Sequence, residues 1–185
     1  MHKEMKLLLI AGAFILLLVL AVFTYHWLSK SYDSEESSDG PLQEDSSLAP
    51  DFTVKDEKGN DISLNDFKGK PVVLNFWTSW CAYCVAEMPE FETIYQEYQA
   101  QGVVFMMVNL TDGSRETQAS AQQFVKDHHY TFPIYYDLQY QGADAYNISA
   151  IPASFFIDKD GKIAAAYRQP LNGKILKQSI ELILK

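Results

Sequence analysis

The sequence predicts an α/β domain in which a mixed central sheet carries helices on both faces. Two almost unbroken apolar runs, residues 70–78 and 103–110, are typical of strands buried on both faces. A helical pattern follows each run, at residues 84–98 and 116–129. The chain then ends with a further strand pair and a helix, and this order of elements predicts a mixed sheet.

Shorter elements complete the domain. In chain order they are a hairpin at 52–64, an extended segment at 132–137, a weak helical turn at 141–148, a hairpin at 153–169 and an amphipathic helix at 171–185. Lys58-Gly59-Asn60 and Asp160-Gly161 are the turn residues of the two hairpins, because glycine adopts the backbone conformations that tight turns need. Every segment after residue 50 is therefore assigned to one folded domain.

Length and charge limit the classes of function. The chain has 185 residues, enough for one domain with appendages, and a formal charge of −9. Residues 1–30 carry +2, residues 31–50 carry −6 and residues 51–185 carry −5. No segment forms a basic patch, so nucleic acid is not expected as a partner.

The N-terminal part predicts a membrane anchor. Residues 7–25 contain no charge and would reach about 28 Å as a helix, close to the thickness of a bilayer's hydrocarbon core. We interpret residues 7–27 as a transmembrane signal-anchor helix; a cleaved signal peptide and a buried core helix are the alternatives. Lys3 and Lys6 place residues 1–6 in the cytoplasm and the remaining chain outside it.

A spacer is expected between this span and the domain. Residues 28–48 are rich in Ser, Asp and Glu and poor in apolar residues, so they cannot bury enough surface to offset the entropy of ordering. We therefore expect a flexible acidic linker followed by a domain at 49–185. This domain would lie outside the cytoplasm, where disulfides persist.

Cys81 and Cys84 are the only cysteines of the chain, and their CxxC spacing carries the chemistry. They follow the first long strand at the expected start of a helix, where the helix dipole favours a thiolate on Cys81. A zinc site would need further ligands, and His128 and His129 lack the usual spacing. A purely structural disulfide closing so short a loop would add little stability. A redox-active pair is the favoured interpretation, with the other two as alternatives.

The residues around this pair resemble a known family. "FWTSWCAYC", the Ile151-Pro152 step and the hairpin after it resemble the thioredoxin superfamily. "APDF" at residues 49–52 and "CxxCxxExP" at residues 81–89 resemble, more narrowly, membrane-anchored thiol-disulfide oxidoreductases of the TlpA/ResA type. The resemblance implies a thioredoxin fold with an N-terminal β-hairpin and an insertion near residues 110–137.

The resemblance also assigns roles to residues. Cys81 would be the attacking thiolate, and Cys84 would resolve the mixed disulfide with the substrate. Ile151 and Pro152 match the family's cis-proline step, which faces the disulfide and receives a substrate strand. Trp80 matches the family's tryptophan on the docking surface, although simple packing would also explain it.

Glu87 matches an acidic position of the ResA-like branch and is expected to handle protons or tune the pair. Its alternative is an ordinary solvated helix residue. Thioredoxins carry an aspartate six residues before the first cysteine, where this chain has Asn75, so Glu87 is the nearer candidate. The intervening Ala82-Tyr83 lacks the proline usual in the TlpA/ResA type, which leaves the direction of electron flow open.

The expected function is that of an extracytoplasmic thiol-disulfide oxidoreductase, without a cofactor or a metal ion. It would reduce disulfides in partner proteins such as apocytochrome c, with electrons from a membrane protein. The alternatives are an oxidant of substrate thiols, a carrier of a soft metal ion and a peroxiredoxin-like peroxidase. Thr78 and Cys81 have the spacing of such peroxidases, but position 74 is Leu where they need a proline.

Overall fold

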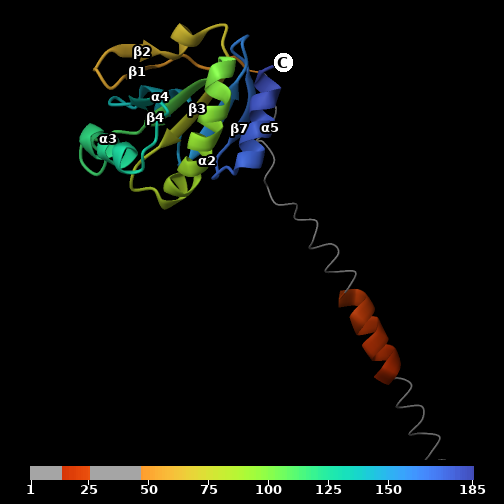
Figure 1. The fold of residues 1–185 in the computed structure, drawn as a ribbon. Helices are drawn as coiled ribbons and strands as arrows, with labels where there is room; N and C mark the ends of the chain where they lie inside the picture. The colour runs from red at the N-terminus through yellow and green to blue at the C-terminus, as the bar shows by residue number, and fades with distance from the viewer. Residues whose placement is uncertain (1–13, 26–46) are drawn as a thin grey trace, which may run out of the picture. The chain divides into compact units, whose positions relative to one another are not determined.

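A seven-stranded mixed sheet forms the centre of the domain in the computed structural model, which describes residues 14–25 and 47–185 (Figure 1). The strands are β1 (Thr53–Lys55), β2 (Asp61–Ser63), β3 (Val72–Trp77), β4 (Val104–Asn109), β5 (Ile134–Tyr136), β6 (Ala153–Ile157) and β7 (Ile163–Tyr167). The helices are α2 (Ala82–Tyr98), α3 (Gln118–Asp127), α4 (Gln141–Ala145) and α5 (Gly173–Ile183), with short 3₁₀ turns η1 (Leu64–Phe67) and η2 (Gln99–Gln101).

The strand order is β2-β1-β5-β4-β3-β6-β7. The pairs β3–β4 and β4–β5 are parallel, and the remaining pairs are antiparallel. The prediction of a mixed sheet is therefore confirmed, as are the N-terminal hairpin β1–β2 and the closing hairpin β6–β7. The segment predicted as an insertion, residues 110–137, supplies helix α3 and the sheet strand β5.

The sheet separates two apolar layers because successive side chains of a strand point to opposite faces. Val73 and Trp77 of β3 pack in one layer with residues of α2, α3 and α5, among them Phe91, Val125 and Leu176. Val72, Leu74 and Phe76 of β3 pack on the other face, in the layer that contains α4 and the N-terminal hairpin. Asn75 is a buried polar residue in the same alternation as Val73 and Trp77, so it lies on the α2 side.

The functional loops meet at the carboxyl ends of β3 and β4. The two strands run in parallel register from Val72 opposite Val104 to Trp77 opposite Asn109. The backbone N–H of Leu110 donates to the carbonyl of Trp77 at 3.0 Å and extends the pairing beyond the strand ends. The loop that leads into Cys81 therefore lies beside the loop that leaves β4, and ligands and catalytic groups gather at such an edge.

The expected anchor is described only in part. The chain divides into two units, Met1–Gly40 and Pro41–Lys185, and in the first the structure describes a helix at residues 14–25. Among the described residues, no helix has the length and apolarity that a membrane span requires. The rest of the expected span 7–27, and most of the expected linker 28–48, lie outside the described residues.

The second long helix differs from its predicted bounds. Helix α3 begins at Gln118 instead of residue 116, because Thr117 caps it: the Thr117 hydroxyl accepts from the N–H of Ser120, whose side chain in turn binds the Thr117 backbone. The helix ends at Asp127, and His129 adopts a left-handed backbone with φ 57°. Glu116 is consequently a loop residue, and this change matters for the site.

Candidate functional site

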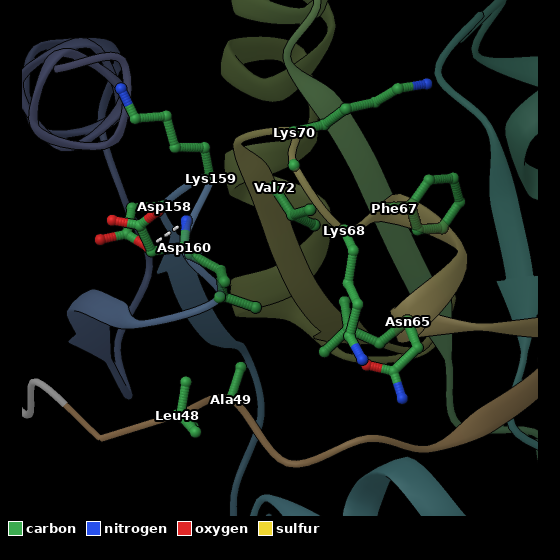
Figure 2. Close-up of a pocket in the computed structure, with 14 residues that line it drawn as sticks. Leu48, Ala49, Asn65, Phe67, Lys68, Lys70, Val72, Asp158, Lys159 and Asp160 are labelled. Atoms are coloured by element: carbon green, nitrogen blue, oxygen red, sulfur yellow. Dashed lines mark hydrogen bonds between the residues drawn. The ribbon is translucent and has the colours of Figure 1, made fainter.

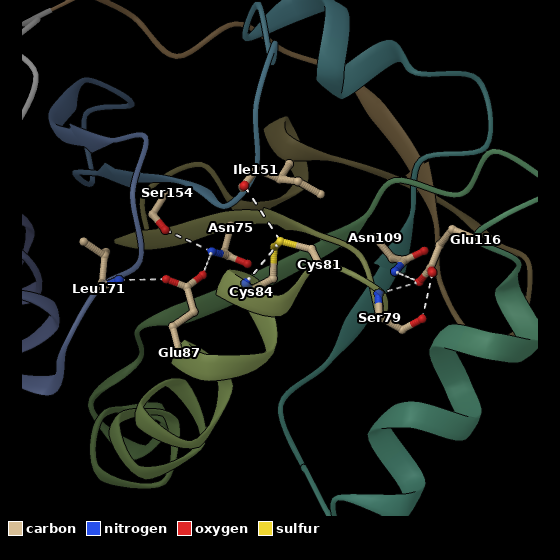
Figure 3. Close-up of a disulfide and its surroundings, with 10 residues drawn as sticks. All are labelled: Asn75, Ser79, Cys81, Cys84, Glu87, Asn109, Glu116, Ile151, Ser154 and Leu171. Atoms are coloured by element: carbon tan, nitrogen blue, oxygen red, sulfur yellow. Dashed lines mark hydrogen bonds between the residues drawn. A yellow bond between two sulfur atoms is a disulfide. The ribbon is translucent and has the colours of Figure 1, made fainter.

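A disulfide joins Cys81 and Cys84, whose Cα atoms lie 5.2 Å apart, at the first turn of α2 (Figure 3). Cys81 is the residue just before the helix, and Cys84 lies within its first turn. The exposed fraction is 7% for Cys81 and 0% for Cys84. The sulfur nearer to solvent thus belongs to the residue expected to attack, and the expected resolving sulfur lies behind it.

The helix start stabilises charge on Cys81. The backbone N–H of Cys84 points at Cys81 Sγ over 3.2 Å, in the arrangement of an N-cap hydrogen bond. Once the disulfide is reduced, the same N–H and the positive end of the helix dipole lower the free energy of a Cys81 thiolate. Cys84 lies inside the helix and does not receive this N-cap hydrogen bond. The two thiols therefore differ in reactivity.

The Ile151–Pro152 peptide bond is cis, as the sequence predicted. It directly precedes β6, the strand that pairs antiparallel with β3. The Ile151 carbonyl oxygen lies 3.8 Å from Cys81 Sγ, so residues seventy positions apart meet at the disulfide (Figure 3). Their expected role, the binding of a substrate strand, stays a prediction.

Glu87 is buried behind the disulfide, with 2% of its surface exposed. One carboxyl oxygen accepts from Asn75 Nδ2 at 2.9 Å, and the other accepts from the backbone N–H of Leu171 at 2.8 Å. Burial raises the pKa of Glu87 to about 8, and these two hydrogen bonds only partly oppose it. The raised pKa favours the protonated carboxyl at neutral pH, and the burial of the side chain excludes the alternative of a solvated helix residue.

Asn75 connects this carboxyl with the rest of the site. Its Nδ2 also donates to Ser154 Oγ of β6 at 2.9 Å, and in Figure 3 its amide lies between Glu87 and the disulfide. Among the described residues, its Oδ1 has no hydrogen-bond partner. An amide group can donate to a carboxylate through its nitrogen or accept the O–H of a carboxylic acid through its oxygen, so Asn75 has the chemistry to bind Glu87 in either protonation state.

Trp80 borders a groove beside the disulfide and is 43% exposed. The groove has a volume of about 150 Å³, and Leu110, Tyr140, Ile148 and Ile151 are among the residues that line it. The guanidinium of Arg115 lies 3.6 Å from the centre of the Trp80 ring, a cation–π contact. The structure thus brings the predicted Trp80 and Ile151 to one surface; their docking role stays a prediction.

Sequence reasoning missed a second polar network on the other side of the disulfide. Glu116 is fully buried and binds Ser79 and Asn109 from the loop before α3 (Figure 3). Its position in the polar run 116–129 suggested an ordinary helix residue. Thr117 is a residue type favoured at the N-cap, and this signal would have placed Glu116 outside the helix.

A larger cavity lies at the opposite end of the sheet and contains neither cysteine (Figure 2). It has a volume of about 340 Å³ and lies near the start of β3 and the end of β6, between Lys68, Lys70 and Asp160 among others. The chemistry belongs to the disulfide edge, where the redox atoms are. Within residues 14–25 and 47–185, no three His, Cys, Asp or Glu side chains are grouped as metal ligands.

The sequence is similar to those of known proteins. Residues 46–166 match the AhpC/TSA family. The chain is 40% identical over 135 residues to the thiol-disulfide oxidoreductase ResA of Geobacillus kaustophilus, covering 73% of each chain. It is 32% identical over 184 residues to ResA of Bacillus subtilis, covering 99% of this chain and 96% of the relative. The similarity therefore includes the segment before the domain.

Solved structures share the fold. StoA of Bacillus subtilis superposes with a TM-score of 0.62 at 33% identity, covering 71% of this chain and 97% of StoA. A putative thiol:disulfide interchange protein DsbE from Chlorobium tepidum superposes with a TM-score of 0.68 at 28% identity, covering 76% of this chain and 98% of that protein. With a CxxC disulfide at a helix start in this fold, the chain belongs to the AhpC/TSA family of thioredoxin-fold proteins and is a thiol-disulfide oxidoreductase of the ResA type.

Proposed function

We propose that this oxidoreductase works outside the cytoplasm, anchored by its N-terminal segment, as a reductant of disulfides in partner proteins. The observation that carries its exchange chemistry is the Cys81–Cys84 disulfide with one sulfur capping α2 and the other fully buried. The reductive direction and the location draw support from the apolar stretch, the acidic spacer and Glu87, the combination that resembles the TlpA/ResA type.

The reaction transfers two electrons in two exchange steps. The Cys81 thiolate attacks one sulfur of a substrate disulfide, forms a mixed disulfide and releases a substrate thiolate, which takes up a proton. Cys84 then loses its proton and attacks Cys81 Sγ, which closes the disulfide seen here and releases the second substrate thiol. The substrate gains two electrons and two protons, and the protein is oxidised.

Glu87 supplies the proton when the protein is reduced again. A donor thiolate attacks Cys81, and Cys84 departs as a thiolate inside the domain, where an unpaired charge is costly. Glu87 lies one helical turn after Cys84 and carries a proton at neutral pH because its pKa is raised to about 8. It can protonate Cys84 at this step, and as a carboxylate it can later take the proton back.

The proposed partners are proteins with accessible disulfides and a membrane protein that delivers electrons. Apocytochrome c is one such substrate, because its haem-attachment Cys-x-x-Cys-His must be reduced before haem is attached. Lys3 and Lys6 support an N-terminus on the cytoplasmic side.

Trapping of partners tests the proposal directly. Cys84→Ser leaves Cys81 free to attack but removes the resolving thiol, so mixed disulfides with substrates should accumulate in cells and separate on non-reducing gels. Cys81→Ser is the matched control and should trap none. The proposal is wrong if Cys84→Ser captures no protein although its Cys81 reacts with iodoacetamide.

The reduction potential tests the direction. A value near thioredoxin's, about −270 mV, supports a reductant, whereas a value near about −120 mV identifies an oxidant. Consumption of hydrogen peroxide at a catalytic rate by the purified protein would instead identify a peroxidase. Labelling of Cys81 in intact cells by a membrane-impermeant maleimide tests the location, and complete protection there with labelling after lysis would contradict it.

A further inference from the structure

Two loops from different strands are joined just before Cys81. One loop follows β3 and contains Ser79 and Trp80; the other follows β4 and contains Arg115 and Glu116. Glu116 binds Ser79, and Arg115 lies on Trp80. Adjacent residues of one loop therefore hold adjacent residues of the other, directly next to the attacking sulfur.

Glu116 fixes the backbone of the segment that leads into Cys81. One carboxyl oxygen accepts from the Ser79 backbone N–H at 2.9 Å and from Asn109 Nδ2 at 2.6 Å, and the other accepts from Ser79 Oγ at 2.7 Å. Glu116 is fully buried, so water cannot replace these bonds. The Ser79 N–H lies two residues before Cys81 and has its acceptor on a neighbouring loop.

The holding loop is itself fixed. Asp112 Oδ1 accepts from the backbone N–H groups of Ser114 and Glu116 at 2.7 and 2.9 Å. These bonds lower the pKa of Asp112, so it stays an acceptor. Gly113, with φ 74°, donates to the Glu116 carbonyl at 2.9 Å. These hydrogen bonds within the loop fix its backbone, and with it the positions from which the Arg115 and Glu116 side chains extend.

Arg115 fixes the exposed side chain of this segment, that of Trp80. Its guanidinium lies 3.6 Å from the centre of the Trp80 ring, and the Trp80 side chain forms part of the groove next to Ile151. A tryptophan that is 43% exposed has several rotamers open to it, and a stacked guanidinium selects one of them. The groove beside the disulfide keeps its shape for that reason.

We propose that Arg115 and Glu116 are positioning residues for thiol-disulfide exchange: Glu116 fixes the backbone that presents Cys81, and Arg115 fixes the Trp80 wall of the substrate groove, an inference that rests on exchange at Cys81 and not on its direction or partner. The need for such a device arises on reduction. The disulfide then no longer restrains Cys81, whereas the hydrogen bonds of Glu116 still hold the backbone at Ser79, two residues before it.

The experiment on Glu116 separates its hydrogen bonds from its charge. Glu116→Gln keeps the bonds, because Gln Oε1 accepts from Ser79 N–H and Asn109 while its Nε2 donates to Ser79 Oγ. Glu116→Ala removes all of them. The measurements are kcat and KM for insulin reduction with dithiothreitol as electron donor, and the rate at which iodoacetamide alkylates Cys81 in the reduced protein.

We expect Glu116→Ala to lower both kcat/KM and the alkylation rate about tenfold, because two of the three lost hydrogen bonds hold Ser79 next to the site. Glu116→Gln should stay within about threefold of the wild type. Thermal unfolding of each variant is followed in parallel. Should Glu116→Ala not fold, Ser79→Ala, which loses only the Oγ bond, is expected to show a smaller decrease in the same two rates.

The experiment on Arg115 uses the same assay. Arg115→Ala should raise KM for insulin by about two- to fivefold, the value of an exposed cation–π contact, and leave kcat nearly unchanged. Lys126→Ala removes an exposed cation from α3 and serves as the matched control. Near-ultraviolet circular dichroism should show a loss of tryptophan signal in Arg115→Ala alone.

Three results would overturn the assignment. The first is a folded Glu116→Ala whose kcat/KM and alkylation rate equal those of the wild type. The second is a Glu116→Gln that loses as much as Glu116→Ala, since charge would then matter instead of position. The third is an unchanged KM in Arg115→Ala. Failure to reduce apocytochrome c would refute the proposed partner and leave these comparisons on insulin intact.

Discussion

Two buried glutamates flank the disulfide, and they are used differently. Glu87 lies on α2 behind Cys84, and Glu116 lies in a loop beside the approach to Cys81. Glu87 accepts one hydrogen bond on each oxygen, from Asn75 and from the Leu171 backbone, whereas Glu116 accepts three, two of them from Ser79. One carboxyl has few donors in an apolar layer, and the other ties two loops together.

The difference shows that burial alone does not define the role of a carboxyl. For Glu87, desolvation exceeds what its donors return and the pKa rises to about 8, so its proton is exchangeable under physiological conditions. Glu116 contributes through geometry, because its partners include the backbone N–H next to Trp80. A proton-handling group and a positioning group therefore stand on opposite sides of one disulfide.

The largest expected effect is a dependence of stability on pH that Glu87 causes. The folded carboxyl keeps its proton up to about pH 8, while the unfolded one loses it near 4.5, so the native state binds more protons between these values. The free energy of unfolding of the oxidised protein should therefore fall as pH rises from 4.5 to 8, by about 5 kcal/mol in all.

Urea unfolding at several pH values measures this slope. Glu87→Gln should remove it, so that the variant is more stable than the wild type at pH 8 and not at pH 4.5. Glu90→Gln, a substitution of an exposed glutamate on the same helix, is the charge-matched control. A wild type whose stability stayed constant across this range would show that Glu87 does not retain its proton.

The second effect concerns the donors of Glu116. Asn109→Ala removes one hydrogen bond to Glu116 and also the acceptor of the Thr111 hydroxyl at 2.8 Å, inside a fully buried site. The expected loss in the free energy of unfolding is about 2 kcal/mol, largely independent of the redox state. Equilibrium unfolding of the oxidised and reduced proteins tests it, and a loss below about 0.5 kcal/mol would contradict the importance of this network.

The smallest effect concerns Ser154 on the Glu87 side. Ser154→Ala removes one acceptor of Asn75 Nδ2, whose other acceptor, Glu87, remains. We expect a loss of about 1 kcal/mol, because one partner of a shared donor is missing. Measured by urea unfolding at pH 6, a larger loss than that of Asn109→Ala would reverse the order proposed for the two networks.

Local patterns predicted much of the fold. The apolar runs at 70–78 and 103–110 became β3 and β4, and the glycine turns marked both hairpins, because strand burial and turn geometry depend on a few neighbouring residues. The start of α3 was predicted two residues early, since a polar run does not by itself distinguish a cap from a first turn.

The sequence by itself determined the redox pair, the helix that Cys81 caps and, through resemblance, the cis peptide at Ile151–Pro152. Only the tertiary structure decided which polar groups are buried together. Asn75 and Glu87 are 12 positions apart, and Ser79 and Glu116 are 37 apart. The role of each carboxyl depends on which donors surround it after packing, and those donors come from strands and loops that are far apart along the chain.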